Sequence, residues 1–163
     1  MQPLITRDDI VKYRQIAKSL NNDKLNESIL EAQLLDLKPL LGERLFDNII
    51  ALPEDYTELL DGGVYTHDGI EYSNYGLKMA LAYFAYARYV MFSHATDTPY
   101  AFVEKRNTDS QPVTSETKKS LFTTNREIAG KVWNNVRMYL QRTNYADYTT
   151  CAVRPAIRFT KIQ

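Results

Sequence analysis

The sequence is poor in the residues that build most catalytic and metal sites. Cys151 is the only cysteine, so the chain has no intrachain disulfide and no pair of thiolates for a metal. The only histidines are His67, which we expect on the surface of a turn, and His94, which we expect at a helix C-terminus. No serine or cysteine is grouped with a base, and no glycine-rich phosphate loop occurs. We therefore predict a protein that is not an enzyme and that binds no cofactor and no metal.

Long hydrophobic runs are also missing. The most apolar segment, Leu77 to Phe92, contains Lys78 and Arg88 and is shorter than the roughly 20 residues of a membrane span. The N-terminus becomes charged at Arg7 before any apolar stretch begins, which argues against a signal peptide. With one cysteine, this pattern predicts a protein kept in a reducing, aqueous compartment with no membrane partner.

The net charge is zero, but acidic and basic residues are unevenly distributed along the chain. Residues 1–100 contain 15 acids and 9 bases, whereas residues 101–163 contain 5 acids and 11 bases. Two interpretations remain open: solvated faces with no further role, or an acidic and a basic side that let copies stack on one another. On the second, the candidate partner-binding residues are Glu54, Asp55, Glu58 and Asp61 on one side and Arg154, Arg158, Phe159 and Lys161 on the other.

Helical periodicity dominates the remaining pattern. The 163 residues suit one domain, 44% of them are hydrophobic, and 12 are tyrosines, which favour half-buried surfaces. Apolar spacing predicts helices over 7–20, 24–37, 43–51, 54–60, 74–95 and from Thr114 or Ser115 to Arg142, with a break or kink at Pro39. The helix over 74–95 is apolar nearly all round, which predicts the buried centre of a bundle. Leu34 and Leu121 are expected on the inner rows of their helices.

Two segments depart from the helical period. Val64–Thr66 and Ile70–Tyr72 flank Asp68-Gly69, which predicts a β-hairpin over residues 63–72. Residues 96–112 are expected to be irregular. Residues 156–162 alternate like an edge strand without a local partner, either a strand for a sheet of another subunit or a solvated end. The fold class is therefore all-α: a bundle of four to five helices over residues 1–145, a small hairpin insertion, and an extended C-terminal arm over 146–163.

Basic residues on the last helix allow two interpretations. They are Lys118, Lys119, Arg126, Lys131, Arg137 and Arg142. Such a row is typical of the solvated side of an amphipathic helix, and it could also form a face that contacts nucleic acid.

The order of the segments resembles a family of tailed-bacteriophage head–tail connector proteins. The resemblance rests on residues 34–42 with Leu45-Phe46, on the hairpin 63–72 before the helix 77–94, and on the loop 98–113 before a helix that closes with Tyr139-Leu140. It covers residues 5 to 145 and leaves the C-terminal arm unmatched.

This resemblance implies a structural virion protein without catalytic activity. Subunits of that family form a ring, typically of about twelve copies, between the capsid portal and the tail, and the ring extends the DNA channel. The implied partners are other copies of the chain, the portal protein and a downstream tail or second ring protein, with DNA only as passing cargo. The implied location is the virion neck, after assembly in the host cytoplasm. The alternative is a small helical protein that binds DNA or regulates its packaging, which predicts steeply salt-dependent binding to duplex DNA.

Overall fold

A computed structural model describes residues 1–16, 22–92, 95–97, 102–104 and 113–148. Its helical segments are α1 (Arg7–Val11), α2 (Asn22–Ala32), the π-helical η1 (Gln33–Leu37), α3 (Lys38–Leu41), α4 (Glu43–Ala51), the 3-10 turn η2 (Pro53–Tyr56), α5 (Thr57–Asp61), α6 (Leu77–Phe92) and α7 (Ser115–Arg142). Two antiparallel ribbons complete it, β1 (Gly63–His67) with β2 (Ile70–Asn74) and β3 (Ala95–Asp97) with β4 (Phe102–Glu104).

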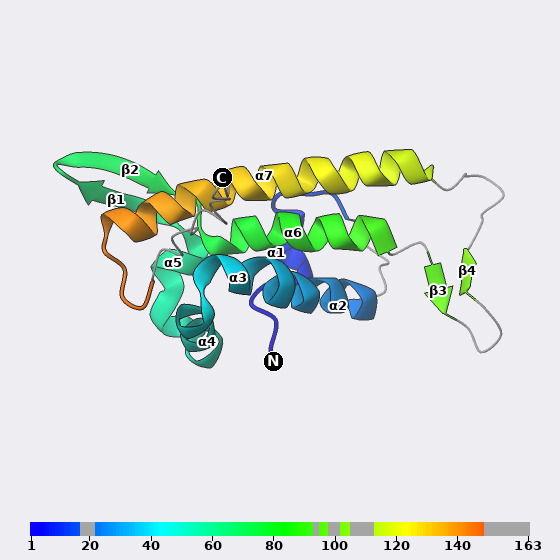
Figure 1. Cartoon of the computed structure of the whole chain (residues 1–163), viewed down its shortest axis with the longest axis horizontal. Coiled ribbons are helices and arrows are strands. Elements are labelled where there is room, and N and C mark those ends of the chain that lie inside the picture. The colour runs from blue at the N-terminus through cyan, green and yellow to red at the C-terminus, as the bar shows by residue number, and fades with distance from the viewer. Residues whose placement is uncertain (17–21, 93–94, 98–101, 105–112, 149–163) are drawn as a thin grey trace, which may run out of the picture.

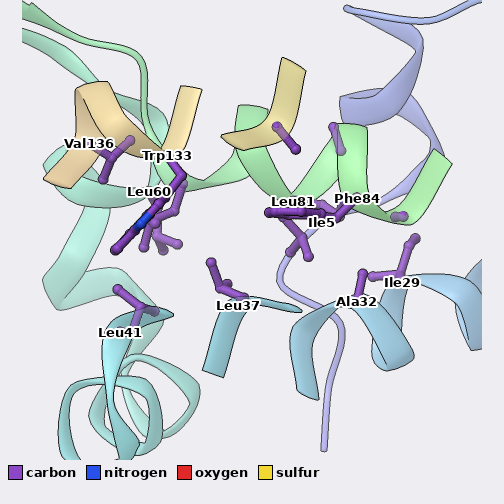
Figure 2. Close-up of a cluster of buried hydrophobic side chains, with 14 of the residues drawn as sticks. Ile5, Ile29, Ala32, Leu37, Leu41, Leu60, Leu81, Phe84, Trp133 and Val136 are labelled. Atoms are coloured by element: carbon purple, nitrogen blue, oxygen red, sulfur yellow. The ribbon is translucent and has the colours of Figure 1, made fainter. Parts of the chain in front are cut away.

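Helix α6 is the centre of the bundle, as its apolar pattern predicts. It lies between α7 on one side and α2 with α3 on the other (Figure 1). Figure 2 shows the core between these layers, where Leu81 and Phe84 of α6 lie among side chains of the flanking helices. Trp133 and Val136 of α7 are buried in the same cluster. The core therefore consists mainly of one face of each long helix packed on α6.

The all-α class and the hairpin insertion are confirmed. Residues Asp68 and Gly69 form the two-residue turn, both with positive φ, and the strands pair from His67 with Ile70 to Gly63 with Asn74. Such a turn follows the right-handed twist of the strands and therefore sets their register. The helical segments outnumber the predicted four to five, because one predicted helix divides at η1 and because η2 and α5 form separate turns.

The first helix is shorter than the predicted 7–20. It ends at Val11, and Tyr13 and Arg14 both donate their backbone N–H to the carbonyl of Ile10. The Tyr13 ring contacts the ring of Tyr83 on α6, and the Arg14 guanidinium lies 5.0 Å from the centre of the Tyr83 ring. These tertiary contacts with α6 replace the helical continuation that the spacing predicts. Residues 17–21 lie outside the described part of the chain.

Pro39 neither breaks nor kinks the chain at its own position; the irregularity precedes it. Residues 33–37 widen into a π-helical turn in which the N–H of Lys38 reaches the carbonyl of Gln33. A proline has no N–H to offer the carbonyl four residues earlier, and a wider turn avoids that requirement. The extra residue also rotates Leu34 outward, so its predicted inner position is wrong.

Two further expectations are corrected by the structure. Residues 95–97 and 102–104 pair as a small ribbon within the segment predicted to be irregular, while 98–101 and 105–112 lie outside the described residues. Leu121 is exposed on α7, and the inward position one turn later belongs to Asn125, whose amide donates to the carbonyl of Leu121. Thr114 caps α7 as predicted, accepting the N–H of Thr117.

Candidate functional site

The four predicted acidic residues are exposed, but they do not form one patch. Glu54 lines an open groove of about 680 Å³ between the N-terminal segment, the end of α4 and α5. Glu58 instead lines a smaller hollow of about 120 Å³ at the base of the hairpin. Asp61 is neutralised by Lys78 at 2.7 Å, and Asp55 is exposed on the 3-10 turn. The structure therefore places Glu54 and Glu58 in two different hollows, and Asp55 and Asp61 in neither of them.

The predicted basic residues lie outside the described part of the chain. Arg154, Arg158, Phe159 and Lys161 belong to residues 149–163, as does Cys151, and His94 lies in a second such segment. The packed part of the chain extends to Tyr148, past the predicted boundary at residue 145. Asp147 forms an ion pair with Arg44 at 2.8 Å and accepts a hydrogen bond from Asn48 at 3.0 Å, both on α4.

A buried glutamine holds the N-terminal wall of the groove. The Gln33 side chain accepts the backbone N–H of Leu4 at 2.6 Å and donates to the carbonyl of Gln2 at 3.2 Å. One side-chain amide thus pairs with the N–H of Leu4 and the carbonyl of Gln2, as a neighbouring strand would. The extended segment from Gln2 to Leu4 is thereby fixed against the bundle.

Tyrosines and one arginine fasten the hairpin to the end of α7. The ring of Tyr65 packs edge-on against Tyr139 with 4.9 Å between their centres, and it also contacts Tyr72 on the paired strand. The guanidinium of Arg142 lies 3.8 Å from the centre of the Tyr72 ring and donates to the Tyr65 hydroxyl at 3.1 Å. This cation–π contact and hydrogen bond cover the inner face of the hairpin, which stabilises a ribbon that would be marginal alone.

The tyrosine cluster continues to Tyr145, which contacts both Tyr139 and Tyr56. Burial, with smaller contributions from Tyr139, Tyr56 and Glu58, raises the pKa of Tyr145 to about 12. Burial also raises the pKa of Tyr139 above its usual value. Burial thus disfavours ionisation of both hydroxyls, and the two rings pack together at the base of the hairpin.

Asn135 of α7 covers the outer edge of β2 at Ser73, near the end of the strand. Its Nδ2 donates to the carbonyl of Ser73 at 2.9 Å, and its Oδ1 accepts the N–H of Tyr75 at 2.9 Å. Sequence reasoning missed this contact, because an asparagine on a helix does not reveal which strand it faces. The hairpin projects beyond the ends of the helices, at the opposite end of the molecule from β3 and β4 (Figure 1).

The outward face of this hairpin carries both polar and apolar side chains. Val64 and Thr66 of β1 and Glu71 and Ser73 of β2 share this face, because cross-strand partners point to the same side. All four are exposed, and Val64 is 70% exposed. We call these four residues the hairpin surface. A projecting two-stranded ribbon with an unpaired edge is a template on which a strand of another chain can pair.

The basic row of α7 is divided by tertiary contacts. Arg126 binds Asp36 at 2.7 Å and lies over the rings of Phe84 and Phe122. Arg142 is held by the hairpin, and Lys118 is buried. Lys119, Lys131 and Arg137 remain exposed. The predicted row of six is therefore not a continuous basic face.

Three features remain: the position of His67, the grouping of side chains that could bind a metal, and the length of the apolar helices. His67 is the last residue of β1, beside the turn rather than in it as predicted, and it is half-buried with its Nε2 3.3 Å from Asp68. Within the described ranges, no group of three or more His, Cys, Asp or Glu side chains is arranged to hold a metal ion. Among the helices that the structure describes, none has the length and apolar character needed to cross a bilayer.

Comparison with protein families gives a match. A family of unknown function (DUF6712) matches residues 37–156, which is most of the chain. The matched range contains the hairpin, α6 and α7, so it includes the hairpin surface and its anchor. No curated protein and no solved structure matches the chain.

Proposed function

We propose a structural role for this chain, which belongs to the DUF6712 family of unknown function: a subunit of an adaptor ring at the head–tail junction of a tailed bacteriophage. Its partners are other copies of itself, about twelve in a closed ring, with the portal protein on one side and a downstream tail or second ring protein on the other. DNA passes through the channel as cargo. The ring is assembled in the host cytoplasm and remains in the virion neck.

The observation that carries this proposal is the anchored hairpin. Tyr65 and Tyr72 hold its inner face to α7 through Arg142, while Val64 on the outer face is 70% exposed. A subunit of a ring needs surfaces that are rigid before assembly, because ordering a loop during association costs free energy. The hairpin meets that requirement, and the separation of acids and bases along the chain supports contacts between unlike faces of neighbouring copies.

Division of the basic row on α7 disfavours the DNA-binding alternative. Arg126 and Arg142 are held in contacts within the bundle and with the hairpin, so they do not join Lys119, Lys131 and Arg137 in one row. Fewer bases available to phosphates means fewer released counterions and a shallow salt dependence of DNA affinity. We therefore retain DNA binding only as the alternative to be tested.

The test is the mass of the full-length protein, measured by native mass spectrometry alone and after mixing with the portal protein of the same phage. We expect a defined complex in which several copies of this chain join the portal ring. A parallel titration of duplex DNA at two salt concentrations is the control. Tight DNA binding that weakens steeply with salt, together with no self-association and no portal complex, would contradict the adaptor role.

A further inference from the structure

The two edges of the hairpin differ in what covers them. In a hairpin with a two-residue turn, the pair beside the turn exchanges hydrogen bonds, and hydrogen-bonded and non-bonded pairs then alternate. The N–H and C=O groups of Tyr65 and His67 therefore point to β2, and those of Val64 and Thr66 point outward. On β2 the outward groups include the carbonyl of Ser73, and Asn135 already binds it.

The outward edge of β1 has no hydrogen-bonded partner among the described residues. Among the described residues, none makes a hydrogen bond to the outward backbone groups of Val64 or Thr66. An uncovered strand edge is a template for one more strand, and natural proteins usually shield such edges. Asn135 blocks the Ser73 end of the β2 edge, whereas no described residue blocks the outward edge of β1, so β1 is the better template for an added strand.

Beside this open edge lies the hollow of about 120 Å³ lined by Glu58, Gly63, Val64 and Tyr65. Gly63 has no side chain to fill the hollow, and the side chain of Glu58 is exposed with no ion pair to any described residue. Between Arg44 and Lys78 the sequence contains no lysine or arginine. A strand that adds to β1 therefore meets a site suited to a side chain with a positive charge.

We propose that the occupant of the β1 edge is the C-terminal segment 152–162 of a second copy of this chain. This inference rests on the proposed ring, in which one face of each subunit contacts a different face of its neighbour. The segment alternates Ile157 and Phe159 with Arg158, and it carries Arg154 and Lys161 without any acid. A segment of alternating polar and apolar residues can pair with a strand edge. The positive charges of its bases are complementary to the negative charges of Glu58 and of Glu71 on the hairpin surface.

The length of the segment is sufficient. Fifteen residues follow Tyr148, the last described residue, and an extended chain of that length reaches about 50 Å. The first residues can therefore serve as a connection to a neighbouring subunit, and enough residues remain to pair along β1. In a ring, each copy would donate its segment to one neighbour and receive one from the other.

Photocrosslinking of the full-length chain tests this proposal. A benzophenone side chain is introduced at Thr66, on the open edge, or at Ser73, the matched exposed position on the covered strand. Each labelled protein is assembled with an excess of isotopically heavy wild-type chain, irradiated, and mapped by peptide mass spectrometry. We expect the Thr66 probe, and not the Ser73 probe, to join heavy peptides from residues 152–162.

Two outcomes would overturn the proposal: crosslinks from Thr66 only to light peptides of its own chain, or the same crosslinks from both positions. A second variant, Val64→Pro, removes one outward N–H without removing a bond of the β1–β2 ladder. We expect it to melt like the wild type and to lose the Thr66 crosslink. Native mass spectrometry separates the two claims. A ring that forms without the crosslink overturns this inference alone, whereas the absence of any ring or portal complex overturns the proposed function.

Discussion

The guanidinium Nε of Arg88 lies 2.7 Å from the Oδ2 atom of Asp36, which is 52 positions away in the sequence. Arg126 of α7 donates to the other oxygen of the same carboxylate, also at 2.7 Å, and the Asp36 side chain is only 3% exposed. The hydrogen bond to Asp36 raises the pKa of Arg88 above its usual value. One carboxylate on the π-helical turn thus joins three layers of the bundle.

Replacing Asp36 with alanine should lower the free energy of unfolding by about 3–5 kcal/mol, because two guanidinium groups would lose the carboxylate between them. Urea denaturation of the variant and the wild type measures this difference. Glu31→Gln is the matched control. Glu31 is 43% exposed and 3.4 Å from Arg88, so its loss should cost no more than about 1 kcal/mol. Equal effects of the two substitutions would show that Asp36 is not the centre of the cluster.

Phe84→Ala should cost about 3–5 kcal/mol, because Phe84 is 6% exposed in the core and its removal leaves a cavity. It also removes the ring beneath the guanidinium of Arg126. Phe92→Ala, at the exposed end of the same helix, is the control and should have little effect. A loss below about 1 kcal/mol for Phe84→Ala in the same denaturation assay would contradict its core position.

Gly62→Ala should destabilise the base of the hairpin strongly. Gly62 has a φ of +81, which side chains rarely adopt, and a Cβ placed there would collide with the carbonyl oxygen of Asn74. Gly130→Ala is the opposite case, since nothing lies within 4 Å of its added Cβ. That substitution in the interior of α7 should stabilise the protein by about 0.5–1 kcal/mol. Thermal melts of both variants should therefore shift in opposite directions.

Alkaline pH should weaken the fold through Tyr145. The unfolded chain releases this proton near its ordinary pKa of 10.0, and the folded chain releases it near 12. Between these values the unfolded state binds fewer protons, so stability is full below about pH 10 and falls as the pH rises toward 12. Tyr145→Phe should reduce this loss, measured as the change in melting temperature from pH 9 upward. Tyr75→Phe, at an exposed position, should leave the pH dependence unchanged.

Deletion of residues 152–163 should leave the bundle folded, because the buried core of the described part of the chain lies within residues 5–140. Far-ultraviolet circular dichroism and the melting temperature should match the wild type, while assembly measured by native mass spectrometry weakens. Arg158→Glu with Lys161→Glu keeps the length and should weaken assembly as well. Unchanged assembly of the deleted chain would contradict a role for the arm, and failure to fold would show that the arm packs on its own domain.

Local features of this protein follow from the sequence alone. The turn at Asp68-Gly69 and the cap at Thr114 depend on neighbours within a few residues, so their chemistry is visible in the order of the amino acids. The same holds for the buried position of Phe84, because α6 is apolar on nearly every side and must lie inside whatever bundle forms.

Other features were decided only by tertiary structure, because their partners are distant in the chain. Leu34 has helical spacing but is exposed, since the π-helical turn before Pro39 rotates it away from the core. Arg126 looks like part of a solvated row until Asp36, 90 positions away, is placed beside it. Asn135 binds the carbonyl of Ser73, on the edge of a hairpin strand 62 positions earlier. Periodicity predicts which face of a helix is apolar, but which polar group that face meets is set by how the helices pack.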